Sequence, residues 1–150
     1  MLKWVDLPPI WLLGCLLLAW AQKTWVPMGL GFGTGWADFL GGLLVGAGLL
    51  LMALAVFEMR RHRTTVIPHL DADALVTTGI FSRTRNPIYL GDSLVLAGMI
   101  LYWGSVLALP LVPIFVWVIE RRFILPEEQR LKRKFVAQFD QYAQQTRRWL

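Results

Sequence analysis

The feature that most constrains this chain is an apolar segment from Phe39 to Phe57 that contains no charged residue. Asp38 precedes the segment and Glu58 follows it. A helix needs about 20 such residues to cross the hydrocarbon core of a bilayer. We therefore predict a membrane-spanning helix over about 38–58.

The composition of the whole chain agrees with lipid as its main solvent. Hydrophobic residues make up 56% of the 150 residues, charged residues make up 17%, and the mean hydropathy is +0.51. A soluble domain carries about 25% charged residues. The net charge of +5 does not indicate a nucleic-acid partner, because the charges lie between and after the apolar segments. They are typical of topology signals and contacts with lipid headgroups.

Two further spans are predicted in the second half of the chain. Leu94 to Ile119 contains no charged residue and is too long for one straight span. A turn at Gly104-Ser105 would divide it. The predicted spans are then about 87–103 and about 106–123.

The first span is shorter, over about 5–21, and Pro8-Pro9 suits its first helical turn. Ala19-Trp20-Ala21 resembles the cleavage site of a signal peptide. However, Lys3 is offset by Asp6, and the weak positive charge before the apolar run favours a helix that is retained.

Small residues and prolines are expected to shape these helices. Gly42 and Gly46 lie four positions apart, with Ala47 and Gly48 following, and this spacing of small residues lets another helix backbone approach closely. Pro110 and Pro113 should bend the fourth span, because proline cannot donate a backbone hydrogen bond.

The basic residues predict the orientation. The connection between the first two spans carries only Lys23. The loop 59–86 carries Arg60, Arg61, Arg63, Arg83 and Arg85. The region at and beyond the end of the fourth span carries Arg121, Arg122, Arg130, Lys132, Arg133, Lys134, Arg147 and Arg148. Basic loops stay in the cytoplasm, so four spans with both termini inside satisfy the pattern, whereas three would place the tail outside. We expect the plasma membrane, the inner membrane in a bacterium.

A helix is also predicted after the fourth span, over about 126–145. Pro126 suits its first turn, and Glu127-Glu128 lie at the positive end of its dipole. An apolar stripe follows at Leu131, Phe135, Phe139 and Tyr142. The predicted fold is therefore an all-α integral membrane protein, a single domain over 1–150 with about four transmembrane helices plus a C-terminal cytoplasmic amphipathic helix.

Two motifs stand at the cytoplasmic ends of predicted helices: Arg85-Asn86-Pro87-Ile88-Tyr89-Leu90-Gly91 and Glu127-Glu128-x-x-Leu131. Each also has a structural interpretation, since Asn86 could cap a helix whose first residue is Pro87. The residues alone leave both interpretations open.

Together with Thr65-Val66-x-Pro68 and Leu75-Val76-x-x-Gly79, these motifs resemble the isoprenylcysteine carboxyl methyltransferase family, which is related to the membrane phospholipid methyltransferases. The resemblance covers about Thr64 to Leu150. It implies an S-adenosylmethionine-dependent methyltransferase that acts on a lipophilic or lipid-like acceptor at the cytoplasmic face. Carried onto this chain, the family's cofactor-binding residues are Arg85, Asn86, Pro87, Ile88, Tyr89, Glu127 and Glu128.

The chemistry of S-adenosylmethionine fits those residue types. An arginine can pair with its carboxylate, glutamates can accept from its ammonium group or ribose diol, and an aromatic ring can lie against adenine or near the sulfonium. The sequence departs from the eukaryotic form of the family pattern at Asn86, where histidine is typical. Asparagine cannot titrate near neutral pH, so a proton-transfer role at this position is in doubt.

No catalytic nucleophile is required, since methyl transfer depends on holding donor and acceptor in line. Arg121, Arg122 and Asp92 are possible substrate contacts, although the arginines could equally anchor the helix at the interface and Asp92 could pair with a basic side chain. The single cysteine, Cys15, and the two histidines, His62 and His69, show no metal-ligand spacing. The expected partners are a lipophilic methyl acceptor and membrane lipid, with the oligomeric state open. The alternative is a non-catalytic membrane scaffold or lipid-binding protein that keeps the fold.

Overall fold

The computed structural model describes residues 5–26, 35–65 and 72–150. In this part of the chain 78% of the residues are helical and no strand occurs, so the predicted all-α class is confirmed. The helices are α1 (Pro8–Trp25), α2 (Gly35–Arg61), α3 (Pro87–Trp103), α4 (Leu111–Ile119), α5 (Leu125–Lys134) and α6 (Val136–Gln145). Val66 and Pro68 of the family-like motif, and His69, lie outside the described residues.

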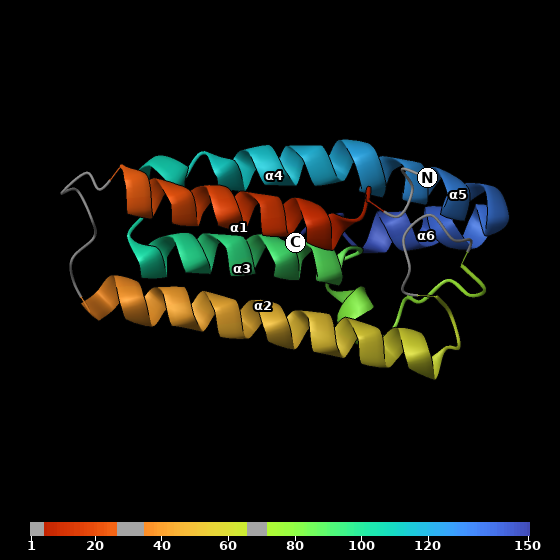
Figure 1. The fold of residues 1–150 in the computed structure, drawn as a ribbon. Coiled ribbons are helices and arrows are strands. Elements are labelled where there is room, and N and C mark those ends of the chain that lie inside the picture. The colour runs from red at the N-terminus through yellow and green to blue at the C-terminus, as the bar shows by residue number, and fades with distance from the viewer. Residues whose placement is uncertain (1–4, 27–34, 66–71) are drawn as a thin grey trace.

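The first four helices run side by side and alternate in direction (Figure 1). α3 is the central helix: α2 packs along one side of it, and α1 and α4 pack on the other side. α5, α6 and the segment 72–86 gather at the end of the bundle where α3 begins (Figure 1). The two basic regions of the sequence therefore meet at one end of the molecule.

Among the described helices, α2 is the one that is long and apolar enough to cross a membrane. Large apolar side chains point outward from it, with Phe39, Leu50 and Phe57 all exposed. Exposed apolar side chains also lie on α1 and α4, as at Leu17 and Trp117. An apolar surface of this kind is typical of contact with lipid or with another apolar partner.

α3 covers the residues 87–103 of the third predicted span. It begins at Pro87, where the missing N–H is not needed by the helix. It ends at Trp103, and the next residue, Gly104, adopts a left-handed backbone (φ 67°) that favours glycine. The turn expected at Gly104-Ser105 is therefore present, and the Ser105 hydroxyl donates to the Ala19 carbonyl oxygen of α1 at 3.0 Å.

Backbones of α2 and α3 touch at two pairs of glycines. A Cβ on Gly41 would lie 2.6 Å from the carbonyl oxygen of Gly98, and a Cβ on Gly48 would lie 2.6 Å from that of Gly91. Real Cβ atoms do not approach backbone oxygens so closely. Only glycine at these positions allows the two helices to pack at this distance.

Of the small residues expected at this contact, Gly48 makes it, but the prediction is wrong for Gly42 and Gly46. A Cβ on either residue would meet nothing within 4 Å. Seven residues are close to two helical turns, so Gly41 and Gly48 share one face of α2, whereas Gly42 is rotated by about 100° from Gly41. The sequence showed a close approach but not which face makes it.

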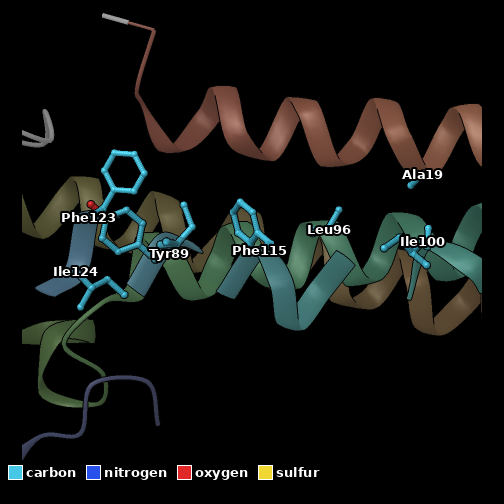
Figure 2. Close-up of a cluster of buried hydrophobic side chains, with 9 residues drawn as sticks. Ala19, Tyr89, Leu96, Ile100, Phe115, Phe123 and Ile124 are labelled. Atoms are coloured by element: carbon cyan, nitrogen blue, oxygen red, sulfur yellow. The ribbon is translucent and has the colours of Figure 1, made fainter. Parts of the chain in front are cut away.

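Buried apolar side chains from α1, α3 and α4 form a row along the bundle (Figure 2). Ala19 and Ile100 lie at one end, Leu96 and Phe115 follow, and Tyr89 lies at the other end (Figure 2). Each of these side chains is at most 7% exposed. The row fixes the position of the first turn of α3 against α1 and α4.

The fourth helix begins later than predicted and is not bent in its middle by its prolines. A 3₁₀ turn at Val106–Ala108 precedes it, and α4 starts at Leu111. Pro110 is the capping residue and Pro113 lies in the first turn, where no N–H is required.

The C-terminal helix predicted over 126–145 is wrong in its bounds. α4 continues through a π-helical turn at Glu120–Ile124 directly into α5, so no separate helix begins at Pro126. The helix is then interrupted at Phe135 (φ −120°, ψ 44°), where α6 begins in a new direction.

The interruption directs the apolar stripe into the protein. Phe139 and Tyr142 of α6 are buried, and the Tyr142 hydroxyl donates to the Phe81 carbonyl oxygen at 2.6 Å. Burial raises the pKa of Tyr142 above its ordinary value, so it stays protonated. This part of the stripe covers the segment before α3 and does not face lipid.

The segment before α3 is also fixed to α2. The Thr78 hydroxyl donates to the Glu58 carboxylate at 2.5 Å. Gly79 has a left-handed backbone (φ 61°), and a Cβ there would lie 2.8 Å from the same carboxylate. The glycine of the Leu75-Val76-x-x-Gly79 motif thus allows the chain to pass close to α2.

We predict that Gly48→Ala lowers the free energy of unfolding by about 1–3 kcal/mol, because the new methyl group overlaps a backbone atom of α3 that cannot move aside. The control is Gly46→Ala, two residues away on an open face. Unfolding by SDS in mixed micelles measures both. Equal stability of the two variants would contradict the backbone contact.

Candidate functional site

A cavity of about 300 Å³ lies at the end of the bundle where α3 begins. Its walls come from the start of α1 (Pro8, Pro9), from α2 (Met52, Val56, Met59), from the first turns of α3, from α5 and from the segment 72–86. The volume is at the lower end of the range for ligand pockets, about 300–1,000 Å³. The cavity is apolar toward α1 and α2 and charged toward α5.

Most of the residues predicted for cofactor binding line this cavity. They are Arg85, Asn86, Pro87, Ile88, Tyr89 and Glu127, and Asp92 lines it as well. Glu128, Arg121 and Arg122 do not. The fold therefore brings the two motifs together although about 40 residues separate them in the sequence.

Tyr89 and Glu127 connect the two motifs directly. The Tyr89 hydroxyl donates to the Glu127 carboxylate at 3.0 Å. The ring of Tyr89 is packed at the end of the buried row, beside Phe123 and Ile124 (Figure 2). Both side chains of the pair are held at the cavity wall by rigid helices.

Arg85 lies on the wall with incomplete pairing. Its guanidinium is 3.6 Å from the Glu128 carboxylate and lies over the ring of Phe139 at 5.9 Å. Its Nε is buried and has no hydrogen-bond partner among the described residues. A buried arginine with unused donors at a cavity wall is suited to bind an anion.

One face of α5 contributes more to the cavity than the motif predicted. Glu127, Arg130, Leu131 and Lys134 all line it. Their spacing of three, four and seven residues places them on one helical face, so the sequence contained a signal for Arg130 and Lys134, although the Glu127-Glu128-x-x-Leu131 motif does not include them. The Lys134 ammonium also donates to the carbonyl oxygen of Ala72, another residue that lines the cavity.

The C-terminal segment folds back along the residues before α3. The Arg85 N–H donates to the Arg147 carbonyl oxygen at 3.0 Å, and the Asn86 amide donates to the Arg148 carbonyl oxygen at 2.9 Å. The Asn86 side chain therefore binds the tail and does not cap α3 as the structural interpretation expected. Only the backbone carbonyl of Asn86 serves the helix, accepting from the Leu90 N–H at 2.9 Å.

Arg148 is the centre of a charge cluster that no sequence motif predicted. Its Nε and one terminal nitrogen donate to the two oxygens of Glu128 at 3.0 and 2.9 Å, and its other terminal nitrogen donates to Glu120 at 3.0 Å. The Trp149 indole also donates to Glu120, at 3.1 Å. The hydrogen bond to Glu128 raises the pKa of Arg148, so its charge is permanent.

Arg121 and Arg122, the two arginines predicted as substrate contacts, do not line the cavity. Arg122 donates to both oxygens of Asp6, at 3.2 and 2.7 Å, and lies over the ring of Trp11. Arg121 is exposed. The geometry favours the alternative interpretation of Arg122, in which it anchors the end of the fourth helix, here to the start of α1.

Asp92 lies one turn beyond Tyr89 on α3, and it is 5% exposed. No described residue donates a hydrogen bond to its carboxylate or forms an ion pair with it. The expected pairing with a basic side chain is thus not seen in the described part.

The described residues also contain no group of His, Cys, Asp and Glu side chains that could hold a metal ion.

Comparison with known proteins gives one finding. Residues 36–138, more than half of the chain, match the family model of the phospholipid methyltransferases. This is the family of the isoprenylcysteine carboxyl methyltransferase-like membrane methyltransferases, so the resemblance stated from the motifs is confirmed. No curated protein and no solved structure gives a significant match.

Proposed function

Since the chain belongs to the phospholipid methyltransferase family, we propose that its cavity binds S-adenosylmethionine beside a lipophilic acceptor at the cytoplasmic face of a membrane. The observation that carries this proposal is the convergence of Arg85, Tyr89 and Glu127 on one cavity. Three groups of different chemistry meet there, and each suits a different part of the methyl donor.

The donors and acceptors at the wall fit S-adenosylmethionine. Arg85 is a cation on the cavity wall whose approach to Glu128, at 3.6 Å, is too long for a hydrogen bond, so its guanidinium suits the carboxylate of the methyl donor. The Glu127 carboxylate suits its ammonium group or ribose diol. The Tyr89 ring suits adenine or the positively charged sulfonium.

The chain's contribution to the reaction is positioning and exclusion of water. S-adenosylmethionine supplies an electrophilic methyl group, and its sulfur keeps the electron pair of the broken bond. Tyr89 and Glu127 are fixed on α3 and α5, so the donor would be held in one orientation. Met52, Val56 and Ile88 form the apolar wall that would keep water from the reacting atoms.

The acceptor would approach from the side of α1 and α2. Both helices line the cavity, at Pro8-Pro9 and at Met52 and Val56, yet each packs mainly against α3. An apolar molecule in the membrane could reach the cavity between them without crossing a charged surface. Asp92 also lines the cavity, further along α3 than Tyr89, and is the candidate acceptor contact.

The membrane topology that this site requires is four spans in a single domain, with the loop 59–86 and both termini in the cytoplasm. In support, the basic loop and the basic C-terminal helices lie at the same end of the bundle (Figure 1). The first four helices alternate in direction, as four spans must.

The topology can be tested with single cysteines after Cys15→Ser. Asp38 and Gln144 are both exposed and lie at opposite ends of the bundle. We expect a membrane-impermeant maleimide to label Asp38→Cys in intact cells, and to label Gln144→Cys only after permeabilisation. Labelling of Gln144→Cys in intact cells would contradict a cytoplasmic site.

We predict that the purified protein binds S-adenosylmethionine and that Arg85→Gln, Tyr89→Ala and Glu127→Gln each weaken binding about tenfold or more, as expected for the loss of a charge-assisted or stacking contact. Isothermal calorimetry in detergent measures the affinities. The control is Arg121→Gln, an exposed arginine outside the cavity. If the folded wild-type protein does not bind S-adenosylmethionine, the methyltransferase proposal is contradicted and a scaffold or lipid-binding protein is favoured.

For Asp92→Asn we expect a different result, because Asp92 is assigned to the acceptor side. Affinity for S-adenosylmethionine should change by less than about twofold, while methyl transfer to extracted membrane lipid should fall at least about tenfold. Transfer of a tritiated methyl group measures the rate. If cofactor affinity falls as far as the rate does, Asp92 belongs to the donor site instead.

A further inference from the structure

The two neighbouring glutamates of α5 have different surroundings. Glu127 lines the cavity, whereas Glu128 does not. Both oxygens of Glu128 accept from Arg148, at 3.0 and 2.9 Å. The prediction from the motif assigned both glutamates to cofactor binding, but of the two only Glu127 lines the cavity that a ligand would occupy.

Glu128 lies close to two arginines, at different distances. Its Oε1 is 3.0 Å from Arg148 and 3.6 Å from Arg85. The two parallel hydrogen bonds from Arg148 match the geometry of a carboxylate, whereas the approach to Arg85 is too long for a hydrogen bond. Without Arg148, the same carboxylate would have Arg85 as its nearest cation.

A direct Glu128–Arg85 hydrogen bond would occupy the donors that an anionic ligand needs. Glu128 approaches one terminal nitrogen of Arg85, at 3.6 Å, and the guanidinium has a fixed set of donors. Glu128 and a ligand carboxylate would therefore compete for Arg85, since both are anions.

We propose that Arg148 is a positioning residue that holds Glu128 away from Arg85, so that the Arg85 guanidinium remains available to the carboxylate of the methyl donor. This inference rests on the proposed function, because it assigns Arg85 to S-adenosylmethionine. It gives the C-terminal segment a part in cofactor binding although Arg148 does not line the cavity.

The position of Arg148 is itself determined by several contacts. Its carbonyl oxygen accepts from Asn86, its guanidinium also donates to Glu120, and the next residue, Trp149, donates to the same carboxylate. The Arg85 guanidinium also lies over the ring of Phe139, at 5.9 Å. These contacts remain when Glu128 alone is changed, so the two partners of the Arg148–Glu128 pair can be tested separately.

The test is a double-mutant cycle of Arg148→Gln and Glu128→Gln, measured by calorimetric affinity for S-adenosylmethionine. Arg148→Gln should weaken binding about tenfold or more, because Glu128 is released to Arg85. Glu128→Gln should bind like the wild type, and the double variant should recover most of the affinity lost by Arg148→Gln. A pair that only stabilises the fold predicts the opposite pattern, in which both single variants are impaired and the double variant is no better.

Two controls isolate the mechanism. Decarboxylated S-adenosylmethionine lacks the group assigned to Arg85, so its affinity should be the same for Arg148→Gln and the wild type. Arg147→Gln removes the same charge from an exposed neighbour and should bind normally. If Arg148→Gln binds S-adenosylmethionine with the affinity of the wild type, or if the double variant recovers no affinity, the inference is overturned and the proposed function still stands. No binding by the wild type would overturn both.

Discussion

The close contact between the backbones of α2 and α3 is the constraint on which the rest of the structure depends. In lipid, apolar side chains gain little by meeting one another, so helices associate where their surfaces can approach closely. Four glycines provide that approach. It holds α3 between α2 and the pair α1 and α4, and α3 is the helix that carries Tyr89 and Asp92 to the cavity. The site is thus a consequence of how the central helix is packed.

The sequence correctly predicted those parts of the fold that depend only on residues adjacent in the chain. Pro87 and Gly104 start and end α3 for reasons of backbone geometry, and the sequence shows both. The register of the α2–α3 contact was predicted incorrectly at Gly42 and Gly46, since a spacing of small residues does not say which face meets the partner. The predicted bounds of the C-terminal helix were also wrong. The break at Phe135 depends on the long-range contacts of the buried Phe139 and Tyr142, which local sequence does not show.

The candidate site shows the same division. The motifs predicted most of its wall, from Arg85 to Tyr89 and at Glu127, because the residue types suit one ligand. The roles of Glu128 and Arg148 could not be predicted: their contact joins residues 20 positions apart across a turn of the chain, and no spacing rule describes it. Asn86 differs from the family's histidine, yet its observed role is to donate one hydrogen bond to a carbonyl group, which an amide does without titrating.

The π-helical turn between α4 and α5 has a consequence for comparing this helix with its relatives. Its hydrogen bonds span five residues where an α-helix spans four, so the turn holds one residue more than the regular helix does. The helix runs on through this turn from α4 into α5 without a break (Figure 1). The turn can therefore be regarded as an insertion of a single amino acid that the helix absorbed locally. An alignment with a relative whose helix is regular would need a one-residue gap within 120–124, and without it Glu127 would be matched to the position of its neighbour.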